Sequence, residues 1–155
     1  MRWDRLGEWP CSVARALSAI GDRWTLLVLR DCFLGVRRFD AFQRDLGLSP
    51  HLLSQRLAKL VDHGILERRV YQRRPRREEY RLTEKGRDLY PVIASLLCWG
   101  DRWMWEGERP SLELVHRGCG RHTTPTLCCS ECGGALDARS VEPRLDPRLS
   151  RRQSP

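Results

Sequence analysis

The sequence predicts a mainly α-helical domain that carries one small β-hairpin, an α+β arrangement, followed by a short cysteine-rich tail. Three observations predict it. Apolar residues recur at helical spacing along most of the first hundred residues. Two β-prone runs then flank an arginine-rich turn between residues 65 and 82. Beyond residue 110 the helical signals fade, and four of the seven cysteines lie there.

Length and charge narrow the class of protein. The 155 residues favour one compact domain with an appendage. The net charge of +8, almost all of it from arginine, indicates a polyanionic partner such as nucleic acid, although a merely solubilising surface charge would look similar. No signal peptide or membrane-spanning run is visible, so we expect a cytoplasmic protein with no membrane partner. In that reducing compartment, cysteines serve as thiols, metal ligands or redox switches more often than as disulfides.

Three helices are predicted over residues 12–20, 23–33 and 38–47. Gly21 ends the first helix, and Asp22 is a suitable N-cap for the second. The apolar residues that share one face of each helix are Val13, Ala16, Leu17 and Ile20, then Trp24, Leu27, Val28 and Phe33, then Phe39, Phe42 and Leu46.

A fourth helix is predicted over residues 49–63, because Ser49 suits the N-cap, Pro50 suits the first helical position and Gly64 stops the helix. One face is apolar and packs inward, through Leu53, Leu57, Leu60 and Val61. The opposite face is polar and carries His51, Ser54, Gln55, Ala58, Lys59 and Asp62.

After Gly64 the apolar period becomes that of strands. Residues 65–81 hold seven arginines and three glutamates, a local charge of +4, and read as a hairpin with a basic tip. Thr83 then caps a long helix that continues to Trp103, and Pro91 either kinks it or marks its true start. Its apolar stripe exposes more surface than one small domain covers, which suggests a dimer contact.

A helix–turn–helix followed by a basic hairpin is the winged-helix arrangement, in which the second helix enters the major groove of DNA and the wing contacts the backbone or minor groove. The alternative is that these polar side chains simply face solvent. The residues predicted to contact DNA are His51, Ser54, Gln55, Arg56 and Lys59 on the helix, and Arg73, Arg74, Arg76 and Arg77 on the wing.

Three sequence blocks occur in an order that is specific for one family. They are CSVARALSAIGDRWTLLVLRD, RRFDAFQRDLGLSPHLLSQRLAKLVDHGILERRVY and EYRLTEKGRDLYPVI. In these blocks the chain resembles the HxlR-type winged helix-turn-helix transcriptional regulators, which are related to the MarR group. The resemblance covers roughly residues 11–105. It implies a homodimer on a two-fold operator, with dimer contacts from the N-terminal segment and the long C-terminal helix.

Cys11 coincides with a cysteine that senses oxidants or electrophiles in some members of that family. A thiol at a helix N-terminus, with Arg15 one turn later, is suited to thiolate formation. The alternative is a small hydrophobic side chain at the dimer interface. Cys11 is therefore a candidate redox sensor.

The tail repeats one short pattern. His116 and Cys119 are followed by a glycine, and so are Cys129 and Cys132, with the same spacing. Two such knuckles would supply a closed Cys₃His zinc site with a structural role. Cys128 and His122 offer competing ligands, and free thiols in a mobile tail are the plain alternative.

The expected organisation is an N-terminal segment (1–10), a winged-helix DNA-binding and dimerisation domain (11–109), a zinc-knuckle-like tail (112–141) and a disordered basic end (142–155). We expect a non-enzymatic, sequence-specific DNA-binding regulator, more often a repressor, whose effector is an oxidant or a small molecule. The alternatives are a thiol-disulfide redox protein using Cys129 and Cys132, or an RNA-binding zinc-ribbon protein.

Overall fold

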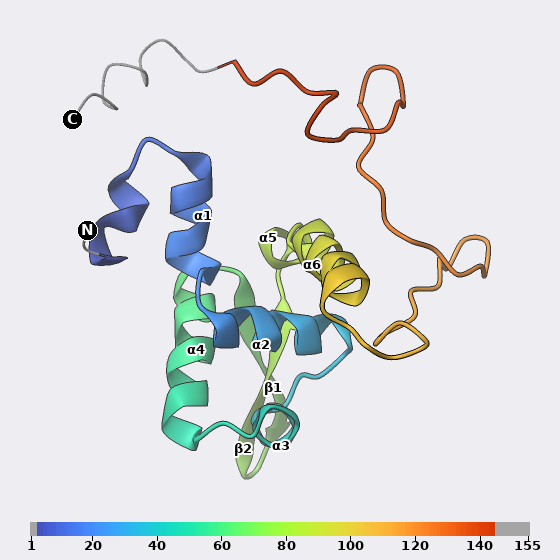
Figure 1. The fold of residues 1–155 in the computed structure, drawn as a ribbon. Coiled ribbons are helices and arrows are strands. Elements are labelled where there is room, and N and C mark those ends of the chain that lie inside the picture. Colours follow the sequence, from blue (N-terminus) through green and yellow to red (C-terminus); the bar gives the residue numbers. More distant parts are fainter. Residues whose placement is uncertain (1–2, 145–155) are drawn as a thin grey trace. The chain divides into compact units, whose positions relative to one another are not determined.

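The computed structural model describes residues 3–144, so that all but the first three residues of the expected basic end (142–155) lie outside the described residues. Contacts divide the chain into two compact units, Met1–Ile93 and Ala94–Pro155. Figure 1 labels the elements in chain order. They are η1 (Trp3–Glu8), α1 (Ser12–Ile20), α2 (Arg23–Phe33), α3 (Phe39–Leu46), α4 (Pro50–Asp62), β1 (Leu66–Arg73), β2 (Arg76–Leu82), α5 (Glu84–Arg87) and α6 (Tyr90–Trp103).

The helix boundaries follow from local capping. The Asp22 carboxylate accepts the Thr25 N–H at 3.0 Å and begins α2, and the Ser49 hydroxyl accepts the Leu52 N–H at 3.3 Å and begins α4. Gly47 ends α3 in the left-handed region, with φ of +63°, which favours glycine. The predicted helices and their caps are confirmed at these positions.

The predicted long helix after Thr83 is instead two helices. α5 ends at Arg87, and α6 begins at Tyr90, so Pro91 is the second residue of α6. Proline is tolerated there because the first turn of a helix has no intrahelical partner for its N–H. Pro91 therefore marks a start rather than a kink.

The core of the first unit is built by α2, α3, α4 and the base of the hairpin. Leu53, Leu57 and Leu60 of α4 are fully buried, which confirms the predicted packing face. The buried cluster consists of Ile20, Val28, Leu29, Phe42, Leu48, Leu53, Leu57, Leu60, Ile65 and Leu66.

Of the apolar face predicted for the first helix, only Ile20 enters this core. Ala14 and Ile20 are the buried residues of α1, whereas Val13 is 67% exposed and Leu17 is 43% exposed. Helical spacing showed that Val13, Ala16 and Leu17 share a face, but it did not show which neighbour covers that face.

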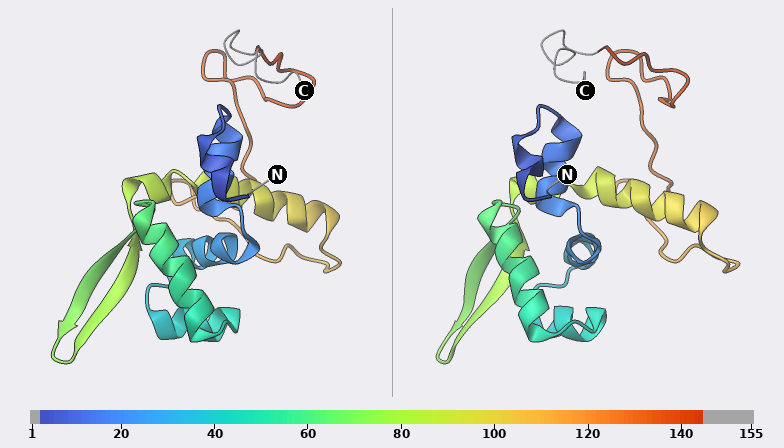
Figure 2. Two further views of the ribbon diagram at one scale, coloured as in Figure 1. Left: turned by 90° about the vertical axis from the view of Figure 1, so that its left-hand side faces the viewer. Right: turned by 60° about the vertical axis from the view of Figure 1, so that its left-hand side comes forward.

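β1 and β2 form an antiparallel hairpin that projects from the helices (Figure 2). The register runs from Leu66 opposite Leu82 to Arg73 opposite Arg76. At its base, the Tyr80 N–H donates to the Arg37 carbonyl at 2.8 Å, which ties β2 to the segment before α3. The hairpin is thus anchored at one end and open at its arginine-rich tip.

The second unit consists of most of α6 and the tail. Among its described residues, Ala94 is the only apolar side chain that is fully buried. The tail holds two isolated bridges, Val115 with His122 and Cys128 with Ala135. No helix within residues 3–144 combines the length and the apolar character needed to cross a bilayer.

Candidate nucleic-acid interface

The outer face of α4 presents three polar side chains near its N-terminus. His51, Ser54 and Gln55 are all exposed, opposite the buried leucines. The Gln55 Nε2 lies 3.0 Å from the His51 Nε2, so these two side chains form a hydrogen-bonded pair one turn apart. An amide and an imidazole at this position offer both donors and acceptors, as base edges in a major groove require.

Arg56 and Lys59, which were predicted to contact DNA, both lie beside Asp22 in the structure. The Arg56 Nε is 3.1 Å from one Asp22 carboxylate oxygen, and the Lys59 Nζ is 4.0 Å from the other. The same carboxylate caps α2 through Thr25. In this structure the two cations connect α4 to the start of α2.

Asp22 is the electrostatic centre of this contact. Partial burial raises its pKa, but hydrogen bonds from Thr25 and the charges of Arg56 and Lys59 outweigh burial, so the net pKa is lowered. The sequence marked Asp22 only as a helix cap. Its ion pairs join residues more than thirty positions apart, which no local pattern indicates.

The predicted wing residues Arg73, Arg74, Arg76 and Arg77 are all exposed at the hairpin tip. Arg76 forms an ion pair with Glu78 at 2.6 Å. The other three make no ion pair with any described residue. Unpaired guanidinium groups on an exposed turn are suited to phosphate contact.

The base of the hairpin is closer to neutral than its composition suggests. Arg69 pairs with Glu67 and Arg81 pairs with Glu79, each at 2.6 Å. Arg68 lies 5.9 Å from the centre of a tyrosine ring, that of Tyr80. The positive charge predicted for the whole hairpin is therefore concentrated at its tip.

The structure adds a residue that the sequence did not indicate. The Arg38 guanidinium lies 4.7 Å from the Tyr71 ring centre, so a residue just before α3 stacks on β1. Arg38 and Tyr71 are 33 positions apart, and no local sequence pattern indicates that they meet.

The α4 N-terminus and the hairpin tip point the same way. Within the first unit, the end of α4 that follows α3 and the turn between β1 and β2 lie on the same side in all views (Figures 1 and 2). The polar face of α4 and the unpaired arginines can therefore meet one surface together.

Cys11 is exposed at the start of α1. The Arg15 Nε donates to the Trp9 carbonyl at 2.9 Å, so this guanidinium is held by the backbone rather than by the thiol. Cys32 is of a different kind: burial, and then the neighbouring Asp31, raise its pKa to about 12, which keeps it protonated.

In the tail, the predicted metal ligands lie as two pairs. The His116 Nδ1 is 3.4 Å from the Cys119 Sγ. Cys129 lies beside Cys132, and backbone N–H groups of Cys132 and Glu131 lower the pKa of the Cys129 thiol. Within the part of the chain that the structure describes, no three His, Cys, Asp or Glu side chains gather as a metal site.

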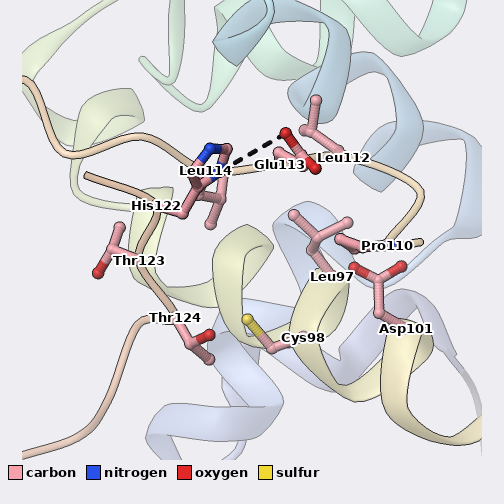
Figure 3. Close-up of a pocket in the computed structure, with 10 residues that line it drawn as sticks. All are labelled: Leu97, Cys98, Asp101, Pro110, Leu112, Glu113, Leu114, His122, Thr123 and Thr124. Atoms are coloured by element: carbon pink, nitrogen blue, oxygen red, sulfur yellow. Dashed lines mark ion pairs between the residues drawn. The ribbon is translucent and has the colours of Figure 1, made fainter. Parts of the chain in front are cut away.

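A cavity of about 320 Å³ lies between α6 and the first part of the tail (Figure 3). Its wall includes Leu97, Cys98 and Asp101 of α6. On the tail side, His122 forms an ion pair with Glu113 at 3.5 Å.

Known relatives match most of the chain. The HxlR-like helix-turn-helix family matches residues 19–108. An uncharacterised HTH-type transcriptional regulator of Mycobacterium tuberculosis is 48% identical over 136 residues, covering 88% of this chain and 86% of the relative. A second uncharacterised HTH-type regulator, from Synechocystis, is 37% identical over 61% of this chain and 70% of its own length.

Solved structures agree with this assignment. PA1607, provisionally assigned as a transcription factor, has a TM-score of 0.79 at 35% identity, covering 90% of this chain and 98% of PA1607. The redox regulator HypR in its oxidised form has a TM-score of 0.56 at 33% identity, covering 59% of this chain and 96% of HypR. With its helix-turn-helix, wing and relatives taken together, the chain belongs to the HxlR-like helix-turn-helix family of transcriptional regulators.

Proposed function

We propose that this protein acts in the cytoplasm as a homodimeric repressor that binds a two-fold DNA operator. The observation that carries the proposal is that the N-terminal end of α4 and the turn of the wing lie on the same side of the first unit, and that the polar residues of α4 and the wing-tip arginines are exposed. In this arrangement α4 enters the major groove, and the wing reaches an adjacent phosphate or minor groove.

The contacts divide into two kinds. His51, Ser54 and Gln55 meet base edges, and Gln55 suits adenine because its amide both donates and accepts. Arg73, Arg74 and Arg77 meet the backbone without reading sequence, which makes binding salt-dependent. Arg56 and Lys59 position α4 through Asp22 and support DNA binding indirectly.

The dimer is supported by apolar side chains that each unit leaves in water. On α1 of the first unit these are Val13 and Leu17. On α6 of the second unit, Leu96 is 47% exposed, Trp99 58% and Trp103 63%. A second copy covering these faces would remove them from water, which is favourable in proportion to the apolar area buried.

The test is a binding measurement on the full-length protein. Genomic fragments that it retains are sequenced, and the enriched site is titrated as a labelled duplex with random duplex and structured RNA as competitors. We expect a palindromic site, a complex of two chains per duplex, and weak competition by RNA. A complex of one chain per duplex would contradict the dimer, and equal competition by RNA would favour RNA binding instead. Loss of repression of a reporter behind the site, on deletion of the protein, tests the sign of regulation.

We further propose that oxidation of Cys11 lowers operator affinity. Its exposure allows an oxidant to reach the sulfur, and a structural relative is a redox regulator. Diamide or hydroperoxide treatment is expected to weaken DNA binding of the wild type but not of Cys11→Ser. Equal weakening of the two proteins would assign the oxidant response to a cysteine other than Cys11.

A further inference from the structure

The tail contains two hairpins with the same backbone pattern, here named the first tail hairpin (residues 114–123) and the second tail hairpin (residues 127–136). In the first, the His116 N–H donates to the Arg121 carbonyl at 2.9 Å. Two residues further out, the Thr123 N–H donates to the Leu114 carbonyl at 2.8 Å. These two bonds close a ladder around a short turn.

The second tail hairpin repeats the ladder thirteen positions later. The Cys129 N–H donates to the Gly134 carbonyl, and the Leu136 N–H donates to the Leu127 carbonyl, both at 2.8 Å. The bridge between Val115 and His122 likewise has its counterpart in the bridge between Cys128 and Ala135.

The turns match as well. Gly120 and Gly133 have φ of +66° and +70°, and their N–H groups donate to the carbonyls of His116 and Cys129 at 2.8 and 2.9 Å. A left-handed residue at the same place in both turns favours glycine because it has no Cβ to clash. The correspondence therefore pairs His116 with Cys129, and Cys119 with Cys132.

Each pair has the spacing of two ligands on one ion. Zinc bonds of about 2.0 Å to nitrogen and about 2.3 Å to sulfur, at a tetrahedral angle, separate the two ligand atoms by about 3.5 Å. The observed distance from the His116 Nδ1 to the Cys119 Sγ is 3.4 Å. In the second tail hairpin the matching backbone hydrogen bonds place Cys129 and Cys132 at the equivalent positions.

Gly118 explains how a histidine replaces a cysteine in the first tail hairpin. A Cβ on Gly118 would lie 2.9 Å from the His116 imidazole Cε1, so the missing side chain leaves room for the ring. The equivalent position of the second tail hairpin is Glu131, and there the residue equivalent to His116 is the smaller Cys129.

The same correspondence argues against Cys128 and His122 as metal ligands. Cys128 matches Val115, and His122 matches Ala135, so both stand at bridge positions outside the turns. His122 is also engaged in its ion pair with Glu113 (Figure 3).

We propose that His116, Cys119, Cys129 and Cys132 bind one zinc ion per chain, as a closed structural site. Each tail hairpin contributes two ligands, and the ion joins the two pairs while the bound thiols release their protons. The tail needs such a tie because every side chain in residues 115–144 is exposed except that of Cys129. A segment without buried apolar side chains gains little from the hydrophobic effect.

The experiment uses the full-length reduced protein, purified without a metal-chelating tag. Elemental analysis is expected to give about one zinc per chain. Replacement by Co²⁺ is expected to give the visible absorption of a tetrahedral ion with three thiolates. Cys119→Ser and Cys132→Ser are each expected to lose this metal, with at least a tenfold faster release to a chromogenic chelator.

The matched controls are Cys128→Ser and His122→Gln, which alter the same residue types at bridge positions. Both are expected to retain one metal per chain and an unchanged cobalt spectrum. Operator binding is measured on every variant, so that loss of the metal is distinguished from failure of the winged helix.

Three results would overturn the proposal. One is a metal-free tail in reduced protein supplied with excess zinc. Another is loss of metal in Cys128→Ser or His122→Gln but retention in Cys119→Ser. The third is one zinc per two chains, which would assign the ligands to different copies. Metal-free protein that reduces insulin through Cys129 and Cys132 would indicate a thiol-disulfide function instead.

Discussion

The winged-helix unit and the tail differ in how their folded structure is stabilised. The first unit buries ten apolar residues in one cluster, whereas residues 115–144 bury none. The wing projects into solvent but is anchored at Tyr80, close to that cluster. The tail hairpins are closed by short backbone ladders and have no such cluster among the described residues. The difference shows that exposed hairpins in one chain can depend on quite different sources of stability.

The strongest test of this difference is a leucine-to-alanine change in each region. Leu57 is fully buried in α4, and its loss should lower the free energy of unfolding by about 2–5 kcal/mol through lost burial and a cavity. Leu136 in the second tail hairpin is 38% exposed, and Leu136→Ala should have a much smaller effect. Urea unfolding followed by tryptophan fluorescence measures both. Equal effects would show that the tail has a core of its own.

The second test separates DNA recognition from metal binding. Gln55→Ala should cost about 1–3 kcal/mol of operator affinity and leave random DNA and metal content unchanged, because only base reading is lost. Cys129→Ala/Cys132→Ala should lose the metal and leave both DNA affinities unchanged. Fluorescence anisotropy on operator and random duplexes gives both affinities. If Gln55→Ala weakens random DNA equally, the side chain does not read a base.

The third test concerns the ion-paired cap of the first unit. Asp22→Ala should lower the free energy of unfolding by about 1–2 kcal/mol at pH 7. The folded pKa of Asp22 lies below its ordinary 3.8, so its stabilisation is present above that value and is lost as the pH falls through the folded pKa. The difference from wild type should therefore shrink in urea titrations at pH 3. Asp22→Asn, which keeps an acceptor for Thr25, should have an intermediate effect, and a pH-independent difference would contradict the ionic contribution.

The smallest expected effect compares two arginines of the wing. Arg74→Ala should weaken all DNA alike and reduce the salt slope by about one, because it removes one unpaired phosphate-binding cation. Arg76→Ala should change the slope less, since Arg76 is already paired with Glu78. Affinities measured at several salt concentrations decide between them. A larger change for Arg76→Ala would show that its ion pair opens on binding DNA.

Much of the fold could be predicted because its signals are local. Ser49, Pro50 and Gly64 bounded α4, and the spacing of Leu53, Leu57 and Leu60 identified its buried face. Two residues of the predicted DNA site make contacts that the sequence did not indicate. Arg56 and Lys59 share a helix with Gln55, but packing turns them toward Asp22.

The sequence by itself determined where helices, strands and turns lie and which residue types line each face, since caps and apolar spacing act over a few residues. Only the tertiary structure decided which charges are neutralised and which apolar faces remain exposed. Those outcomes depend on contacts between residues far apart in the chain, such as Asp22 with Arg56. The same is true of the tail, where equal spacing indicated two knuckles and matching backbone hydrogen bonds distinguished the proposed ligand positions from the bridge positions.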